Sequence, residues 1–185
     1  KGLITQMVKD NKVAWHAGKS KWKNFKNLNE NSIGIELVNK GHEFGYQNFN
    51  NTQIISLINL CRTLKKKYMI KKENFLGHSD IAPLRKQDPG EKFPWKKLSR
   101  HKIGCWCGES KIKLKFSKKK KLKSLFFKNL YKIGYRYFQV NKRVKKDKFI
   151  IKAFQQHYLP NHITGTIDQK TFKISHFLAK RIKLA

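Results

Sequence analysis

Residues 77–90 carry the side chains of this chain that are best suited to chemistry: an imidazole at His78, an ammonium at Lys86 and a carboxylate at Asp88. The proline and glycine residues among them predict an ordered surface loop, where functional groups are usually displayed. Lys86 and Asp88 are two positions apart, so in extended backbone both point to one face. A histidine and an aspartate around a zinc ion, with one position open for water, would make a catalytic site. Ordinary surface groups are the alternative.

The elements that must position this loop begin with a predicted strand at residues 32–38. Isoleucine and leucine alternate there with Gly34 and Glu36, which is typical of a strand with two distinct faces. Glu36 is therefore a carboxylate on the same face as a glycine. It is either a functional group beside the loop or a solvent-facing group on an edge strand.

A helix is predicted at residues 54–68, where apolar side chains recur at helical spacing behind Thr52, the expected N-cap. Short strands are expected at residues 3–8 and 75–76, and the second of them delivers His78 at its end. Strands that alternate with a helix indicate an α/β fold.

The chain changes character beyond Trp106. Residues 109–120 are rich in lysine and are expected to form a basic linker. Three helix-like segments follow, at residues 121–132, 147–157 and 168–182, and their apolar residues could bury one another. A small second domain of three helices is therefore predicted.

The composition is strongly basic, with 43 Lys+Arg against 11 Asp+Glu and a formal net charge of +32. Such a charge favours a polyanionic partner, either nucleic acid or an anionic bacterial envelope, although a lysine-rich genome bias is an alternative explanation. The motifs of nucleic-acid modules do not occur, so we expect no specific nucleic-acid partner. No apolar run is long enough to predict a transmembrane segment.

Three cysteines, an odd number, do not predict a disulfide framework. Cys61 lies on the apolar stripe of the helix predicted at residues 54–68 and is expected to be a core thiol. Cys105 and Cys107 are separated by one residue, which is poor spacing for a shared zinc ion or an unstrained disulfide.

The whole pattern resembles the zinc-dependent N-acetylmuramoyl-L-alanine amidases of the type-2 amidase family, and within it the two-domain AmiD-like branch. The matching motifs occur in family order, at residues 14–22, 31–39, 75–90 and 93–95. Residues 153–160 and 164–171 are similar to the three-helix peptidoglycan-binding domain that follows the catalytic domain in that branch.

The resemblance implies a mixed β-sheet flanked by helices in a catalytic domain at residues 1–108. The basic linker at 109–120 and a helical, peptidoglycan-binding-like domain at 121–185 would follow. Peptidoglycan or muropeptides are then the expected partner, and we expect a monomer. The expected location is the bacterial cell envelope or periplasm rather than the cytoplasm, with any export signal or membrane anchor preceding Lys1.

The resemblance also implies roles for the residues of the loop and the strand. His78 and Asp88 correspond to zinc ligands, and Glu36 and Lys86 to the catalytic pair. Bound zinc acidifies a water molecule, Glu36 would accept its proton, and Lys86 would stabilise the developing oxyanion. The bond cut would join the lactyl group of muramic acid to L-alanine.

One ligand of the family's zinc site is not found in this sequence. A catalytic zinc normally has three protein ligands, and the family's remaining ligand is a histidine upstream of the segment that matches Lys1. An incomplete sequence of an active enzyme, a truncated and inactive peptidoglycan-binding relative, and substitution by another residue such as His16 are the three explanations. Trp15, His16 and Arg85 are candidate substrate-binding residues.

Overall fold

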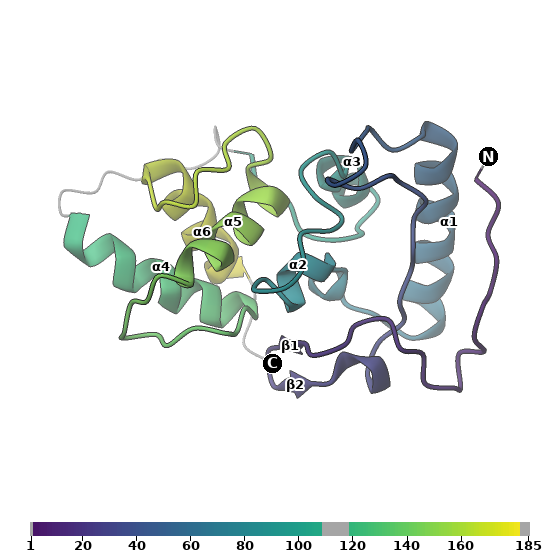
Figure 1. Cartoon of the computed structure of the whole chain (residues 1–185). Coiled ribbons are helices and arrows are strands. Elements are labelled where there is room, and N and C mark those ends of the chain that lie inside the picture. The colour runs from purple at the N-terminus through teal and green to yellow at the C-terminus, as the bar shows by residue number, and fades with distance from the viewer. Residues whose placement is uncertain (1, 109–118, 182–185) are drawn as a thin grey trace.

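The structure is a computed structural model that describes residues 2–108 and 119–181 (Figure 1). Its elements, in chain order, are β1 Lys21–Trp22, β2 Phe25–Lys26, η1 Leu28–Glu30, α1 Asn51–Lys67, η2 Lys72–Asn74, α2 His78–Ile81, α3 Trp95–Arg100, α4 Lys119–Ile133, α5 Asp147–Tyr158 and α6 Gln169–Arg181. The helices form two groups, α1 with α3 and α4 with α5 and α6, and α2 lies between these groups (Figure 1).

Helix α1 confirms the helix predicted at residues 54–68, although it begins a turn earlier. Asn50, rather than the expected Thr52, is the N-cap: its side chain accepts the Thr52 N–H, and the Gln53 side chain accepts the Asn50 N–H in return. This reciprocal capping box satisfies two backbone donors that a helix start otherwise leaves unpaired. Three lysines in the last turn suit the negative end of the helix dipole.

The buried face of α1 packs against the segment around α3 and forms what we term the α1 core. Its members are Ile54, Leu57, Ile58, Cys61, Phe93, Trp95, Leu98 and Ile103. Cys61 is buried there, as predicted for a core thiol. Burial raises the pKa of its thiol to about 11, so it remains protonated and inert at neutral pH.

The strands predicted at residues 3–8, 32–38 and 75–76 are wrong as hydrogen-bonded elements. Across the described residues the sheet has two strands only, β1 and β2, which pair antiparallel. Alternating side chains favour extended backbone, but a strand exists only where a second strand pairs with it. The described chain brings no such partner to these three segments, which run as irregular chain.

Helices α4, α5 and α6 confirm the helices predicted at 121–132, 147–157 and 168–182, except that residue 182 lies outside the described residues. Residues 109–118 of the expected basic linker also lie outside them. The three helices enclose a larger core that includes Phe126, Phe154 and Phe172. This core also takes in Trp22 and Ile81 from the first half of the chain, and we therefore term it the shared core.

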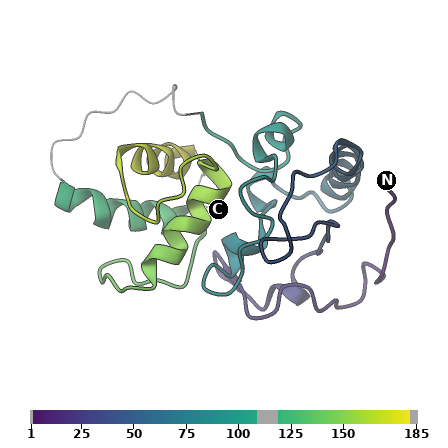
Figure 2. The ribbon, with the colours of Figure 1, turned by 45° about the horizontal axis from the view of Figure 1, so that its top comes forward.

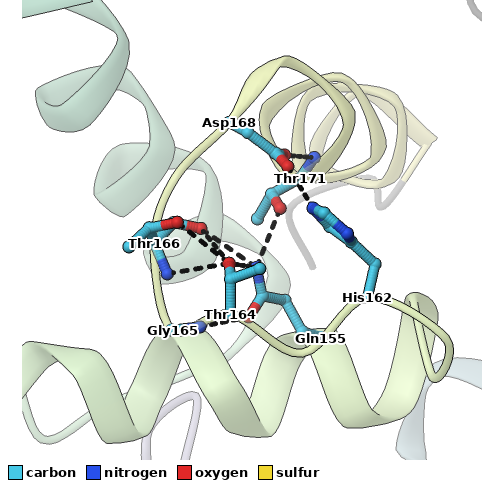
Figure 3. Close-up of polar contacts among 7 residues, drawn as sticks. All are labelled: Gln155, His162, Thr164, Gly165, Thr166, Asp168 and Thr171. Carbon is cyan, nitrogen blue, oxygen red and sulfur yellow. Dashed lines mark hydrogen bonds and ion pairs between the residues drawn. The ribbon is translucent and has the colours of Figure 1, made fainter.

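A polar network closes the turn between α5 and α6 (Figure 3). Gln155 is fully buried at its centre; its Oε1 accepts the Gly165 N–H at 2.8 Å, and its amide nitrogen donates to oxygen atoms of Thr164, Thr166 and Thr171. Asp168 accepts the Thr171 N–H at 2.8 Å and pairs with His162. A buried amide whose donors and acceptor are satisfied fixes one conformation of the turn.

Candidate functional site

His78 and Asp88 meet at the start of α2. His78 is the first residue of this short helix, and its Nδ1 lies 3.0 Å from Asp88 Oδ2. The other ring nitrogen, Nε2, lies 3.1 Å from the carbonyl oxygen of Ala17. The Asp88 side chain is 57% exposed and that of His78 is 15% exposed. The structure therefore places both predicted zinc ligands side by side, with the carboxylate open to solvent.

The backbone around Asp88 is held from two sides. The Asp88 carbonyl oxygen accepts the Ser79 N–H at 2.9 Å, which ties it to the first turn of α2. The Tyr46 hydroxyl donates to the carbonyl oxygen of Pro89 at 2.6 Å. A side chain at Gly90 would overlap the Tyr46 hydroxyl, so a glycine lets the loop of residues 40–47 approach this closely.

Charge around Asp88 keeps it ionised. Partial burial alone would raise the pKa of its carboxyl, but the hydrogen bond and charge of His78 and the charge of Lys86 outweigh burial and lower that pKa. A carboxylate that stays deprotonated suits a cation ligand.

Arg85 contacts the same small region. Its guanidinium donates to the Ala17 carbonyl oxygen at 2.7 Å and lies 3.4 Å from His78 Nε2. The backbone N–H groups of Arg85 and Lys86 both donate to the carbonyl oxygen of Ala82. This turn brings the Arg85 guanidinium beside His78, and Lys86 is the next residue in the chain.

Trp15 and His16 directly precede Ala17, whose carbonyl oxygen contacts both His78 and Arg85. Glu36 is exposed, and Gly34, two residues before it, packs so closely on the His16 ring that a side chain at this glycine would overlap it. Trp15 is 90% exposed, so its indole is free to contact a ligand.

Two residues that sequence reasoning passed over hold the site together. Asn29 is buried, and its Oδ1 accepts the backbone N–H groups of His16, Ala17 and Gly18 at 2.7–3.2 Å. Asp80, two residues after His78, is also buried. For Asp80 the only signal in the sequence is its place between Ser79 and Ile81, a small and an apolar residue, and Asn29, which is followed by Glu30, offers no such signal.

The donor types suit zinc, which binds imidazole nitrogen and carboxylate oxygen. Within residues 2–108 and 119–181, however, no three His, Cys, Asp or Glu side chains are grouped so that they could hold a metal ion. The pair therefore fits as part of a zinc site and supplies two of the three protein donors that a catalytic zinc usually takes.

A cavity of about 640 Å³ lies elsewhere, and none of the predicted site residues lines it. Its walls come from the β1–β2 hairpin and from residues 136–144, and they are basic and aromatic: Lys21, Lys23, Asn24, Phe25, Lys26, Arg136, Tyr137, Phe138, Gln139, Lys142 and Val144. Among the described helices, none has the length and hydropathy needed to cross a membrane.

Comparison with known proteins identifies the family of the chain. The model of the Amidase_2 family, described as N-acetylmuramoyl-L-alanine amidase, matches residues 1–91. The chain is 33% identical to N-acetylmuramoyl-L-alanine amidase AmiD of Escherichia coli over 98% of its own length and 68% of that protein. It is 41% identical to 1,6-anhydro-N-acetylmuramyl-L-alanine amidase AmpD of Haemophilus influenzae over 52% of its own length and 50% of that protein.

Solved structures share the fold. The complex of E. coli AmiD with anhydro-N-acetylmuramic acid-L-Ala-D-gamma-Glu-L-Lys matches with a TM-score of 0.82 and 32% identity, over 96% of this chain and 72% of that one. AmpDh3 of Pseudomonas aeruginosa in complex with anhydromuramic pentapeptide matches with a TM-score of 0.83 and 30% identity over the same shares. These matches confirm the predicted fold class, and the chain is an AmiD-like member of the N-acetylmuramoyl-L-alanine amidase family.

Proposed function

We propose that this chain hydrolyses the amide bond between N-acetylmuramic acid and L-alanine in peptidoglycan or in muropeptides. The observation that carries the proposal is the His78–Asp88 pair, 3.0 Å apart at an open surface within the segment that the family model matches. The similarity to an amidase over nearly the whole chain supports the same reaction.

The proposed roles follow from the chemistry of amide hydrolysis. His78 and Asp88 would hold zinc, and the bound ion would acidify a water molecule and polarise the scissile carbonyl. Glu36 takes the proton of the attacking water and returns it to the leaving amine. Lys86 lies close enough to the pair to lower the pKa of Asp88, and its ammonium offsets the charge that develops on the carbonyl oxygen.

Substrate binding is assigned to Trp15, His16 and Arg85, whose segments converge on the pair through Ala17. The two solved relatives that hold muropeptides support a ligand of this class. We further propose that residues 121–185 form a wall-binding domain joined to the catalytic domain 1–108 by a linker at 109–120. A net charge of +32 would hold a monomer of this enzyme against an anionic envelope.

A second candidate function, peptidoglycan binding without catalysis, is favoured by one observation. The described residues offer two donors for a metal that normally takes three, and affinity depends steeply on ligand number. Zinc content separates the two functions. We expect about one zinc ion per chain if the chain is an enzyme, and no bound zinc if it only binds the wall.

The catalytic roles are tested by release of stem peptides from a muropeptide, followed by chromatography. Glu36→Gln keeps the shape of the side chain but removes the base, so we expect turnover to fall by about 10²-fold or more. Glu43→Gln, an equally exposed glutamate on the same segment, is the matched control and should retain full activity. Activity that survives Glu36→Gln combined with Lys86→Ala would refute the proposed mechanism.

A further inference from the structure

Asp80 is a buried carboxylate two residues after His78, and only 1% of it is exposed. Three donors converge on it. Its Oδ2 accepts the Gly77 N–H at 2.8 Å and the His157 Nδ1 proton at 2.7 Å, and its Oδ1 accepts the Tyr135 hydroxyl. A carboxylate this deeply buried is tolerated only when donors such as these replace water.

The donors come from both halves of the chain. Gly77 directly precedes His78, whereas His157 lies in the last turn of α5 and Tyr135 follows α4, in the C-terminal group of helices. Figures 1 and 2 both show α5 beside α2, and residues of these two helices are in contact. The turn that begins at Gly77 is therefore held by Tyr135 and His157, which follow Asp80 in the sequence by 55 and 77 residues.

The ring of His157 is fixed on both faces. Its centroid lies 3.9 Å from that of Trp95 and 4.0 Å from that of Tyr158, and the planes are nearly parallel. Trp95 belongs to the α1 core and Tyr158 to the shared core. His157 Nε2 is buried and finds no partner among the described residues, so Nδ1 makes its one hydrogen bond, the bond to Asp80.

Tyr135 is equally constrained. It is fully buried, and its ring packs edge-on against Trp22 with centroids 5.0 Å apart. Burial and the neighbouring Asp80 carboxylate raise the pKa of its hydroxyl well above the usual value. The hydroxyl therefore stays protonated at neutral pH and remains a donor to Asp80.

Backbone hydrogen bonds connect Asp80 to the two predicted zinc ligands, His78 and Asp88. Asp80 fixes the Gly77 N–H immediately before His78, and the next residue, Ser79, donates its N–H to the Asp88 carbonyl oxygen at 2.9 Å. We propose that Tyr135 and His157 are positioning residues, which hold Asp80 so that His78 and Asp88 keep the spacing that the site requires.

This proposal gives the C-terminal helices a task besides contact with the wall. Apolar packing already joins the two halves of the chain through the shared core, and a buried charge adds little net stability to such a junction. Hydrogen bonds to the Asp80 carboxylate are directional, so they fix the orientation of the turn, which apolar packing alone does not. A displacement of about 1 Å at a metal ligand is enough to impair a site.

Hydrogen–deuterium exchange on the metal-free chain tests whether Tyr135 and His157 hold the turn around Asp80, and it does not require activity. The variant is Tyr135→Phe combined with His157→Gln, and the matched control is His162→Gln, which breaks the other His–Asp contact of these helices at the α5–α6 turn (Figure 3). We expect amides of residues 77–88 to exchange about tenfold faster or more in the double variant, because the turn opens locally. The control should leave them unchanged.

Unchanged exchange at residues 77–88 in a folded double variant, or an equal increase in the control, would overturn the proposal. If the double variant does not fold, Tyr135→Phe alone and Asp80→Asn take its place, since both keep the packing and remove only part of the hydrogen bonding at Asp80. They should give smaller increases confined to residues 77–88. The same two outcomes overturn the proposal for them.

The inference rests on the proposed function in one respect, namely that His78 and Asp88 on this turn bind zinc. On a muropeptide substrate, Tyr135→Phe should lower kcat several-fold and change KM little, because substrate contacts remain and only ligand geometry loosens. A chain that proves inactive would refute the amidase proposal while the exchange result still decides whether the helices hold the turn.

Discussion

The first fifty residues and the C-terminal helices differ sharply in how they treat apolar side chains. Leu3, Trp15 and Val38 are almost fully exposed, whereas Phe126 and Phe154 are completely buried. The first region carries several predicted site residues on irregular chain, and the second encloses a dense core. The difference indicates that helices distant in sequence add rigidity to the site, beyond that of nearer contacts such as those of Asn29 and Tyr46.

The largest expected effect comes from Phe154→Ala in the shared core. Phe154 contacts the rings of Phe126, Tyr135 and Tyr158, so truncation leaves a cavity and should cost about 3–5 kcal/mol of unfolding free energy. Denaturant unfolding followed by circular dichroism measures the loss. A cost below about 1 kcal/mol would mean that the shared core is not the main source of stability, and the contrast between the regions would fail.

Gly134→Ala tests whether the two regions unfold together. Gly134 has a φ of 139°, and a side chain there would lie 2.4 Å from the Trp22 ring, which belongs to the first half of the chain. We expect a loss of about 1–3 kcal/mol from overpacking, with one transition seen by both tryptophan fluorescence and circular dichroism. Two separate transitions would show that the halves are independent.

Asp168→Ala should produce a smaller, pH-dependent effect within the second region. Burial opposes ionisation of Asp168, but hydrogen bonds from Thr171 and the contact with His162 prevail and lower its pKa. Because the pKa of Asp168 is lower in the folded state than in the unfolded state, where it is about 4, the ionised side chain stabilises the fold above about pH 4. This stabilisation is lost as the pH falls through the pKa of the folded state. The variant should lose about 1 kcal/mol of unfolding free energy at pH 7, because the Asp168 carboxylate no longer accepts the Thr171 N–H at the start of α6. The loss should be smaller below pH 4. Thermal melts across pH 2–7 check this, and a difference that grows on acidification would contradict it.

The smallest effect is expected for Phe44→Ala in the first region. Phe44 is 75% exposed, so its removal should change the unfolding free energy by less than about 0.5 kcal/mol. A loss above about 1 kcal/mol in the same denaturant measurement would indicate that the apolar side chains of this region are covered in solution. The contrast between the two regions would then be narrower than the structure shows.

The helices and the His78–Asp88 loop could be predicted because their signals are local. Apolar residues at helical spacing define α1, α5 and α6, and turn formers between His78 and Asp88 indicate an ordered loop. The strands predicted at 3–8 and 32–38 failed because pairing depends on a partner that alternation does not reveal. The buried role of Asp80 was not predicted for the same reason. Its partners Tyr135 and His157 lie far away in the sequence, and no local pattern distinguishes a buried, hydrogen-bonded aspartate from one in an exposed turn.

The distance between Asp80 and His157 has a consequence for the order in which the protein is built. The residues of the α1 core lie between Ile54 and Ile103, so this part can collapse as soon as it leaves the ribosome. The turn that begins at Gly77 must wait for a histidine 77 residues behind Asp80, roughly 4–15 seconds at 5–20 residues per second. During synthesis the turn around His78 therefore stays without this partner until α5 has emerged, and until then chaperones and proteases can reach it.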